Sequence, residues 1–107
     1  REALKDTAFE LPTDFPEREN IFLRFAIKHQ NAHEIIKKAW GSNILLGDWY
    51  TNPLAPDDTQ LEKLQYKKGS CPKAEHLGEI MLNLPTHINI SERDQEKAIE
   101  FIKSNAD

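Results

Sequence analysis

Apolar residues in this chain gather into three short runs of the kind that form β-strands. Residues 21–27 are β-branched and aromatic, bounded by polar residues, and make the clearest predicted strand. In that strand Phe22, Arg24 and Ala26 share one face. Residues 44–46 and 80–84 are shorter apolar runs, each stopped by a glycine or a proline. Three strands are therefore expected.

Helical spacing appears in three other segments. Asn31 can cap the amide of Glu34 while Glu34 reaches back, as in a capping box, and Gly41 is a natural stop. Ser91 and Asp94 repeat the capping pattern before the last helix. A middle helix begins at residues 70–72, where proline suits the first turn. The expected inner faces are Ala74, Leu77 and Ile80 in the middle helix, and Ala98, Ile99, Phe101 and Ile102 in the last.

The element order is strand, helix, strand, loop, helix, strand, helix, with short connections. This order predicts an α+β fold: a small, mostly antiparallel sheet with helices packed mainly on one face. Residues 1–20 contain two prolines and many charges, so they are interpreted as an N-terminal arm or linker before a domain at 21–107. Within the arm, Phe9, Leu11 and Phe15 alternate and are expected to lie extended against the body. The uncovered sheet face, with Phe22 and Ala26, would suit docking onto a larger domain.

Charge and length narrow the functional classes. Eighteen acidic and fourteen basic residues in 107 give a net charge of −4. That balance argues against partners such as nucleic acid or an anionic membrane. No apolar run approaches the roughly 20 residues that span a bilayer, and the first residues lack the pattern of a signal peptide. The single cysteine excludes an internal disulfide. A cytoplasmic protein is expected.

Four residues stand out as candidates for ligand binding. Arg24 lies within an apolar strand and needs a partner, either an acid of this chain, which is the favoured interpretation, or a ligand carboxylate. Trp49, Tyr50 and Asn52 lie in an irregular loop with two prolines, where aromatic rings and an amide can form a ligand wall. The alternative is that the two rings merely cover the core.

The sequence gives little support for a reactive cysteine, a metal site or a Schiff-base lysine. Cys71 and His76 are five positions apart and fall on different faces of a helix, and His29 and His33 lack a third metal ligand. All ten lysines occupy polar positions, whereas a Schiff-base lysine needs desolvation or a cationic neighbour. No complete active site is therefore expected, with no catalytic, cofactor-binding or metal-binding residue on this chain.

Several short motifs nevertheless follow one another in a recognisable order. They are GSCPKAE at 69–75, MLNLPTH at 81–87 and ISERDQ at 90–95, preceded by LRF at 23–25 and LGDWY at 46–50 with Pro53 after it. This series resembles the C-terminal part of the DegT/DnrJ/EryC1/StrS family of aminotransferases, over about residues 22–103. Relatives commonly have histidine two residues after the loop proline. This chain has Ala55 there, which leaves the substrate open.

The resemblance implies an enzyme of two domains. Such proteins are fold-type-I, pyridoxal-phosphate-dependent homodimers that transfer an amino group from glutamate or glutamine, mostly to nucleotide-linked keto sugars. The large domain, which carries the cofactor lysine, would precede Arg1, so the chain alone is expected to be inactive. Trp49, Tyr50 and Asn52 would be substrate neighbours, with Arg24 as a carboxylate clamp. The alternative is a free-standing α+β module for ligand binding or protein interaction, without catalysis.

Overall fold

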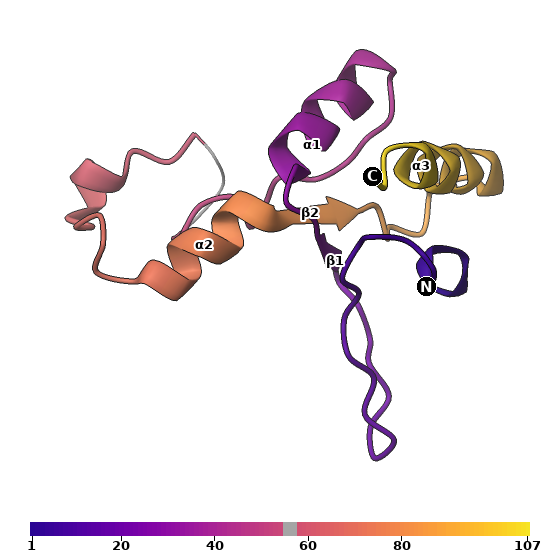
Figure 1. Cartoon of the computed structure of the whole chain (residues 1–107), viewed down its shortest axis with the longest axis horizontal. Helices are drawn as coiled ribbons and strands as arrows, with labels where there is room; N and C mark the ends of the chain where they lie inside the picture. The colour runs from indigo at the N-terminus through magenta and orange to yellow at the C-terminus, as the bar shows by residue number, and fades with distance from the viewer. Residues whose placement is uncertain (55–57) are drawn as a thin grey trace.

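The computed structural model describes residues 1–54 and 58–107. Five elements organise the fold, and they are labelled in Figure 1. They are β1 (Phe25–Lys28), α1 (Ala32–Gly41), α2 (Pro72–Ile80), β2 (Met81–Leu84) and α3 (Glu92–Ser104). Short 3-10 turns lie at Glu2–Leu4 (η1) and Leu61–Leu64 (η2). No helix in the described ranges is long and apolar enough to cross a membrane.

The two strands pair antiparallel, with Ile27 opposite Leu82 and Ala26 opposite Asn83. Because α2 ends at Ile80 and β2 begins at Met81, the helix runs directly into the sheet (Figure 1). The predicted α+β class, with an antiparallel sheet and three helices, is confirmed.

The sheet is smaller than predicted. Residues 44–46 do not form a strand, because the N–H of Ile44 donates to Ala39 and that of Leu46 donates to Ile44. These turn-like bonds use the donors that a ladder would need. Only Gly47, one residue later, forms a bridge, and it pairs with Asn83. The first strand begins at Phe25 instead of residue 21.

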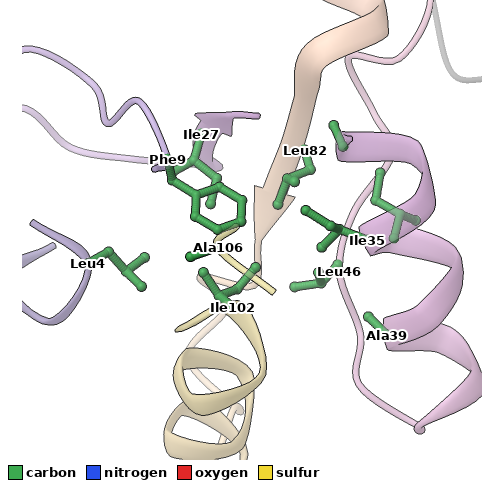
Figure 2. Close-up of a cluster of buried hydrophobic side chains, with 11 residues drawn as sticks. Leu4, Phe9, Ile27, Ile35, Ala39, Leu46, Leu82, Ile102 and Ala106 are labelled. Atoms are coloured by element: carbon green, nitrogen blue, oxygen red, sulfur yellow. The ribbon is translucent and has the colours of Figure 1, made fainter. Parts of the chain in front are cut away.

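The core forms where α1 and α3 meet the inward face of the sheet. Ile27 and Leu82 are fully buried, and Ile35 and Ala39 of α1 approach them from one side (Figure 2). Ile102 of α3 closes the core from another side. Alternation along the strands thus directs one residue in two into the core, as period-2 patterning requires.

The N-terminal segment also contributes to the core. Leu4 and Phe9 are both buried there. Glu10 pairs with Lys28 through two backbone hydrogen bonds of 3.0 Å and through a side-chain ion pair. The expected extended contact is therefore found at residues 9–10, whereas Phe15 remains exposed.

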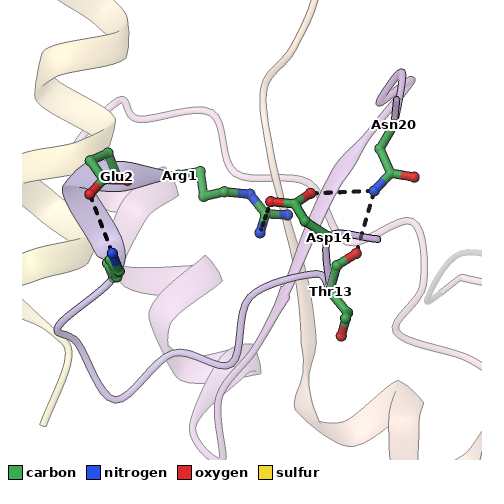
Figure 3. A network of polar contacts seen from close by, with 6 residues as sticks. Arg1, Glu2, Thr13, Asp14 and Asn20 are labelled. Atoms are coloured by element: carbon green, nitrogen blue, oxygen red, sulfur yellow. Dashed lines mark hydrogen bonds and ion pairs between the residues drawn. The ribbon is translucent and has the colours of Figure 1, made fainter. Parts of the chain in front are cut away.

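Beyond Glu10 the chain runs outward and returns to β1, which we call the projecting hairpin (residues 11–24; Figure 1). The amide of Asn20 donates to the Thr13 carbonyl and to Asp14, both at 3.4 Å (Figure 3). Arg1 pairs with Asp14 at 2.8 Å. The hydrogen bonds of Asn20 are exposed, and so is the Asp14 side chain that pairs with Arg1.

The helices agree with the sequence prediction at the cap of α3 and differ from it at the start of α1 and on the inner face of α2. The Ser91 hydroxyl accepts the N–H of Asp94, as predicted for α3. The Asn31 side chain makes no capping bond; its backbone N–H donates instead to the His29 ring. In α2, Leu77 is exposed and Gly78 is the buried residue, because the helix backbone packs closely against Thr51.

His29 links four parts of the fold. Its Nδ1 accepts the Asn31 N–H at 3.1 Å, so the proton resides on Nε2, which donates to the Ala106 carbonyl at 3.3 Å. The ring packs against Phe9, with centroids 4.6 Å apart. This buried histidine therefore ties β1, the start of α1, the N-terminal segment and the C-terminus together.

We predict that His29→Ala lowers the free energy of unfolding by about 2–3 kcal/mol, because a buried carbonyl and an N–H lose their partners. His76→Ala is the control; that ring is largely exposed and makes only a 3.8 Å contact to Glu79. The control should change stability by less than about 0.5 kcal/mol. Urea unfolding followed by circular dichroism measures both, and equal effects would contradict the linking role.

Candidate functional site

The aromatic loop (residues 47–54) starts from the sheet. Gly47 and Asn83 exchange two backbone hydrogen bonds, of 2.8 and 2.9 Å. The backbone carbonyl of Asp48 then accepts hydrogen bonds from the N–H and the hydroxyl of Thr51, at 3.1 and 2.6 Å, and these bonds close a tight turn. Trp49 and Tyr50 occupy the middle of this turn, and their side chains are 48% and 44% exposed. The two rings therefore present a surface to solvent more than they cover the core.

Arg24 reaches this loop from the projecting hairpin. Its guanidinium carbon lies 4.4 Å from the Trp49 ring centroid, the geometry of a cation–π contact. No carboxylate of residues 1–54 or 58–107 lies within 4.0 Å of it, so the favoured ion pair is not found with any of those acids. The strand begins one residue later and leaves Arg24 exposed at the surface, where its guanidinium packs on the Trp49 ring.

Asn52 occupies the other side of the loop, next to α2. The Oδ1 atom is buried and has no hydrogen-bond partner among the described residues. The neighbouring Thr51 is buried against Gly78, and a Cβ at Gly78 would lie 3.0 Å from the Thr51 carbonyl. The structure thus brings Arg24 and Trp49 into contact, and places Tyr50 and Asn52 on the same short loop. Ala55, where relatives have histidine, lies outside the described residues.

A cavity of about 670 Å³ opens beside Arg24, which we call the Arg24 cavity. Gly47 and Asn83, the bridge pair, belong to its lining. Asn83 is 3% exposed, and both polar atoms of its amide lack a hydrogen-bond partner among the described residues. Sequence reasoning missed this residue. The available signal was an amide inside an otherwise apolar strand, which requires a partner when buried.

The GSCPKAE motif forms a polar clasp at the start of α2. Glu75 Oε1 accepts the Tyr66 hydroxyl and the Gly69 N–H, both at 2.6 Å. The Tyr66 hydroxyl, followed by the Gly69 N–H, lowers the pKa of Glu75, and the same contact raises the pKa of Tyr66. Gly69 has φ of 90°, a conformation that favours glycine. The clasp therefore fixes the loop that enters α2.

The remaining candidates for chemistry are engaged in structural contacts. His33 Nε2 lies 2.8 Å from the Gly78 carbonyl, and His29 is held as described above. Cys71 is exposed, and His76 contacts Glu79. In the part of the chain that the structure describes, no three metal-ligating side chains come together.

Comparison with known proteins gives the family. The profile of the DegT/DnrJ/EryC1/StrS aminotransferase family matches residues 1–103, so the chain belongs to this family. A comparison with curated proteins gives no match.

Two solved structures share the fold. A DegT DnrJ EryC1 StrS aminotransferase from Brucella abortus is 26% identical, with a TM-score of 0.74 over 98% of this chain and 28% of that chain. DesV of S. venezuelae, solved in complex with a ketimine intermediate, is 17% identical, with a TM-score of 0.77 over 99% of this chain and 29% of that one. The chain therefore spans less than a third of the length of either protein.

We predict that Gly78→Ala destabilises the fold by about 1–3 kcal/mol, because the new methyl group would press on the backbone of the aromatic loop. Gly41→Ala, in α1, is the matched control, since nothing lies within 4 Å of its Cβ position. The control should stabilise the helix by up to about 1 kcal/mol. Thermal unfolding distinguishes the two, and a stabilising Gly78→Ala would contradict the close packing.

The Glu75 carboxylate makes the stability of the fold depend on pH. The folded-state pKa of Glu75 lies below its ordinary value of 4.5, so its carboxylate stabilises the fold above that value. The stabilisation is lost as pH falls through the lowered pKa. Glu75→Gln should therefore be less stable than the parent at neutral pH, with the difference shrinking in acid. Denaturant titrations across pH test this, with the exposed Glu62→Gln as a control that stays flat.

Proposed function

We propose that this chain is the C-terminal small domain of a pyridoxal-phosphate-dependent aminotransferase. The observation that carries the proposal is the family match over residues 1–103, combined with a fold that corresponds to only 28–29% of two related chains. In this proposal a large domain of the same polypeptide is the partner of residues 21–107, with residues 1–20 as the connecting arm. The complete enzyme would be a homodimer.

The residues of this chain do not fit covalent attachment of the cofactor. Nine of the ten lysines are exposed, and the tenth, Lys28, forms an ion pair with Glu10. None of the ten is buried, so none has the desolvated setting that favours a Schiff-base lysine. We therefore assign the cofactor lysine to the large domain and expect no turnover from the isolated chain.

The contribution of this chain would be one wall of the substrate site. The half-exposed rings of Trp49 and Tyr50 offer apolar area, and the unpartnered Oδ1 of Asn52 can accept a substrate hydroxyl after a small movement. Arg24 packs on Trp49 and pairs with no acid among the described residues, and in this proposal its guanidinium binds a substrate carboxylate. We propose an amino group transfer from glutamate or glutamine to a nucleotide-linked keto sugar. Polysaccharide and secondary-metabolite synthesis are the pathways that use such products.

One observation favours the second candidate, a free-standing module that binds a ligand or a protein without catalysis. Leu4 and Phe9 anchor the N-terminal segment in the core, as expected for a self-sufficient domain. An immunoblot of the native gene product separates the two. A band several-fold larger than 12.4 kDa supports the aminotransferase domain, and a band of that size supports the module.

In the full-length protein, Arg24→Ala is predicted to lower kcat/KM for amino transfer by about 10- to 100-fold, because a charged hydrogen bond to substrate is lost. The matched control is Arg18→Ala, which removes a similar cation–π contact to Phe15, at 4.3 Å, on the same hairpin. The control should keep kcat/KM. Equal activity of the two variants in a coupled glutamate assay would show that Arg24 does not bind substrate.

A further inference from the structure

We propose that His33 and Trp40 of α1 are positioning residues that hold the aromatic loop in the conformation that binds substrate. Each side chain donates a hydrogen bond to a backbone carbonyl next to one end of the loop. This inference rests on the proposed function, because it gives the aromatic loop the task of binding substrate.

One side of α1 lies along the aromatic loop. Ile36, Lys37 and Trp40 follow His33 by three, four and seven positions, so the four residues share one face of the helix. A small cavity of about 30 Å³, with room for one or two water molecules, lies between this face and the loop. It is lined by these four residues of α1 and by Asp48 and Thr51 of the loop. Helix and loop are therefore close neighbours.

Trp40 holds the beginning of the loop. Its indole Nε1–H donates to the carbonyl of Leu46 at 2.8 Å. Leu46 is fully buried in the core, and Gly47, which follows it, forms the bridge to Asn83. The first residue of the aromatic loop is therefore attached to the sheet by its own backbone and to α1 through its neighbour.

His33 supports the other end of the loop through the end of α2. Because α2 passes directly into β2, the carbonyls of its last turn have no partners within the helix. His33 Nε2 lies 2.8 Å from the Gly78 carbonyl, and since a carbonyl only accepts, Nε2 carries the proton and donates. The backbone N–H of His29 donates to the Ile80 carbonyl, also at 2.8 Å. Two residues at the beginning of α1 and just before it thus cap the end of α2.

Gly78 connects this cap to the aromatic loop. A Cβ at Gly78 would lie 3.0 Å from the carbonyl oxygen of Thr51 and 3.3 Å from the nitrogen of Asn52, so the two backbones are in close contact. His33 holds the carbonyl of Gly78 while the α-carbon of Gly78 packs against the Thr51–Asn52 peptide. Without the His33 hydrogen bond the end of α2 is free to move, and the peptide that carries Asn52 moves with it.

Support at both ends matters because the rings between them are half exposed. Trp49 and Tyr50 have only part of their surface packed on the protein, so their positions depend on the backbone that carries them. A loose loop loses conformational entropy when substrate binds, whereas a loop held at both ends has lost it already on folding. His33 and Trp40 are therefore expected to affect substrate binding more than the rate of the chemical step.

Peptide-resolved hydrogen exchange of the full-length protein tests the support. His33→Ala should speed exchange in residues 47–54 by about tenfold, and exchange in β1 and β2 by less than about twofold. His33→Gln, which keeps an N–H donor, should restore the parent rate. His76→Ala is the matched control, since that exposed ring contacts Glu79. Unchanged exchange at 47–54, or equal acceleration in the strands, would overturn the proposal.

Trp40→Phe is a second, independent variant, which keeps an aromatic ring and removes the N–H donor. It should speed exchange in the same peptide, most strongly at Gly47, next to the Leu46 carbonyl that loses its bond. Unchanged exchange at Gly47 would remove Trp40 from the proposal.

The reaction with L-glutamate tests the consequence for substrate binding. Glutamate is the probe because Arg24, packed on Trp49, is the proposed ligand of a substrate carboxylate. In single turnovers followed by cofactor absorbance, His33→Ala should raise the glutamate concentration at half-maximal rate by about 5- to 20-fold and change the maximal rate by less than about twofold. His33→Gln should restore the parent value. A lower maximal rate at an unchanged half-maximal concentration would overturn the positioning role.

The two measurements separate this inference from the proposed function. A full-length parent that does not react with glutamate defeats the proposed function, and hydrogen exchange then still decides whether His33 and Trp40 hold the loop. A parent that reacts, with a His33→Ala variant that behaves like the parent in both measurements, defeats only the positioning role.

Discussion

The pairing of Ile27 with Leu82 is the contact on which the rest of this structure depends. Both side chains are fully buried, and 54 residues separate them along the chain. Once β1 and β2 pair, their inward face receives α1 and α3, and the loss of exposed apolar area provides the main driving force for folding. The sheet of the described residues has two short strands, so the core depends strongly on this pair. The N-terminal segment and Leu46 are then recruited to complete a core that would otherwise remain open.

The same pairing creates the candidate site on the opposite face. Asn83 lies opposite Ala26, and Gly47 bridges to Asn83, so the aromatic loop begins at the sheet and turns toward Arg24. The inward face of the sheet packs into the core and stabilises the fold. The candidate site on the other side includes the exposed rings of Trp49 and Tyr50 and the Asn83 amide without a described partner.

The clasp of Glu75, Tyr66 and Gly69 shows how a motif with no catalytic residue can still matter for the site. It fixes the entry to α2, and α2 in turn supports Thr51 through the close approach at Gly78. The position of Asn52, which follows Thr51, therefore depends on the clasp through the packing of α2. A sequence motif of this kind reports on architecture, and its contribution to function is the placement of a neighbouring loop.

The sequence by itself determined the fold class, the three helices and the irregular aromatic loop, because these depend on local patterns such as capping, periodicity and proline, and its series of motifs indicated the family. Whether Trp49 and Tyr50 cover the core or face solvent was left open by the sequence. It also predicted the Ser91 cap, which needs only a hydroxyl three residues before a free N–H. Tertiary structure decided the rest. Residues 44–46 form turn bonds in place of a strand, and the Asn31 side chain makes no capping bond. Arg24 packs on the Trp49 ring and pairs with no acid among the described residues. Asn83 became a candidate only when its surroundings were known. The contact of Arg24 with Trp49 and the surroundings of Asn83 join residues far apart in the chain, which a local pattern does not encode. The bonds at residues 44–46 and at Asn31 are local, but they compete with the predicted strand and cap, and the pattern of apolar residues does not decide between such alternatives.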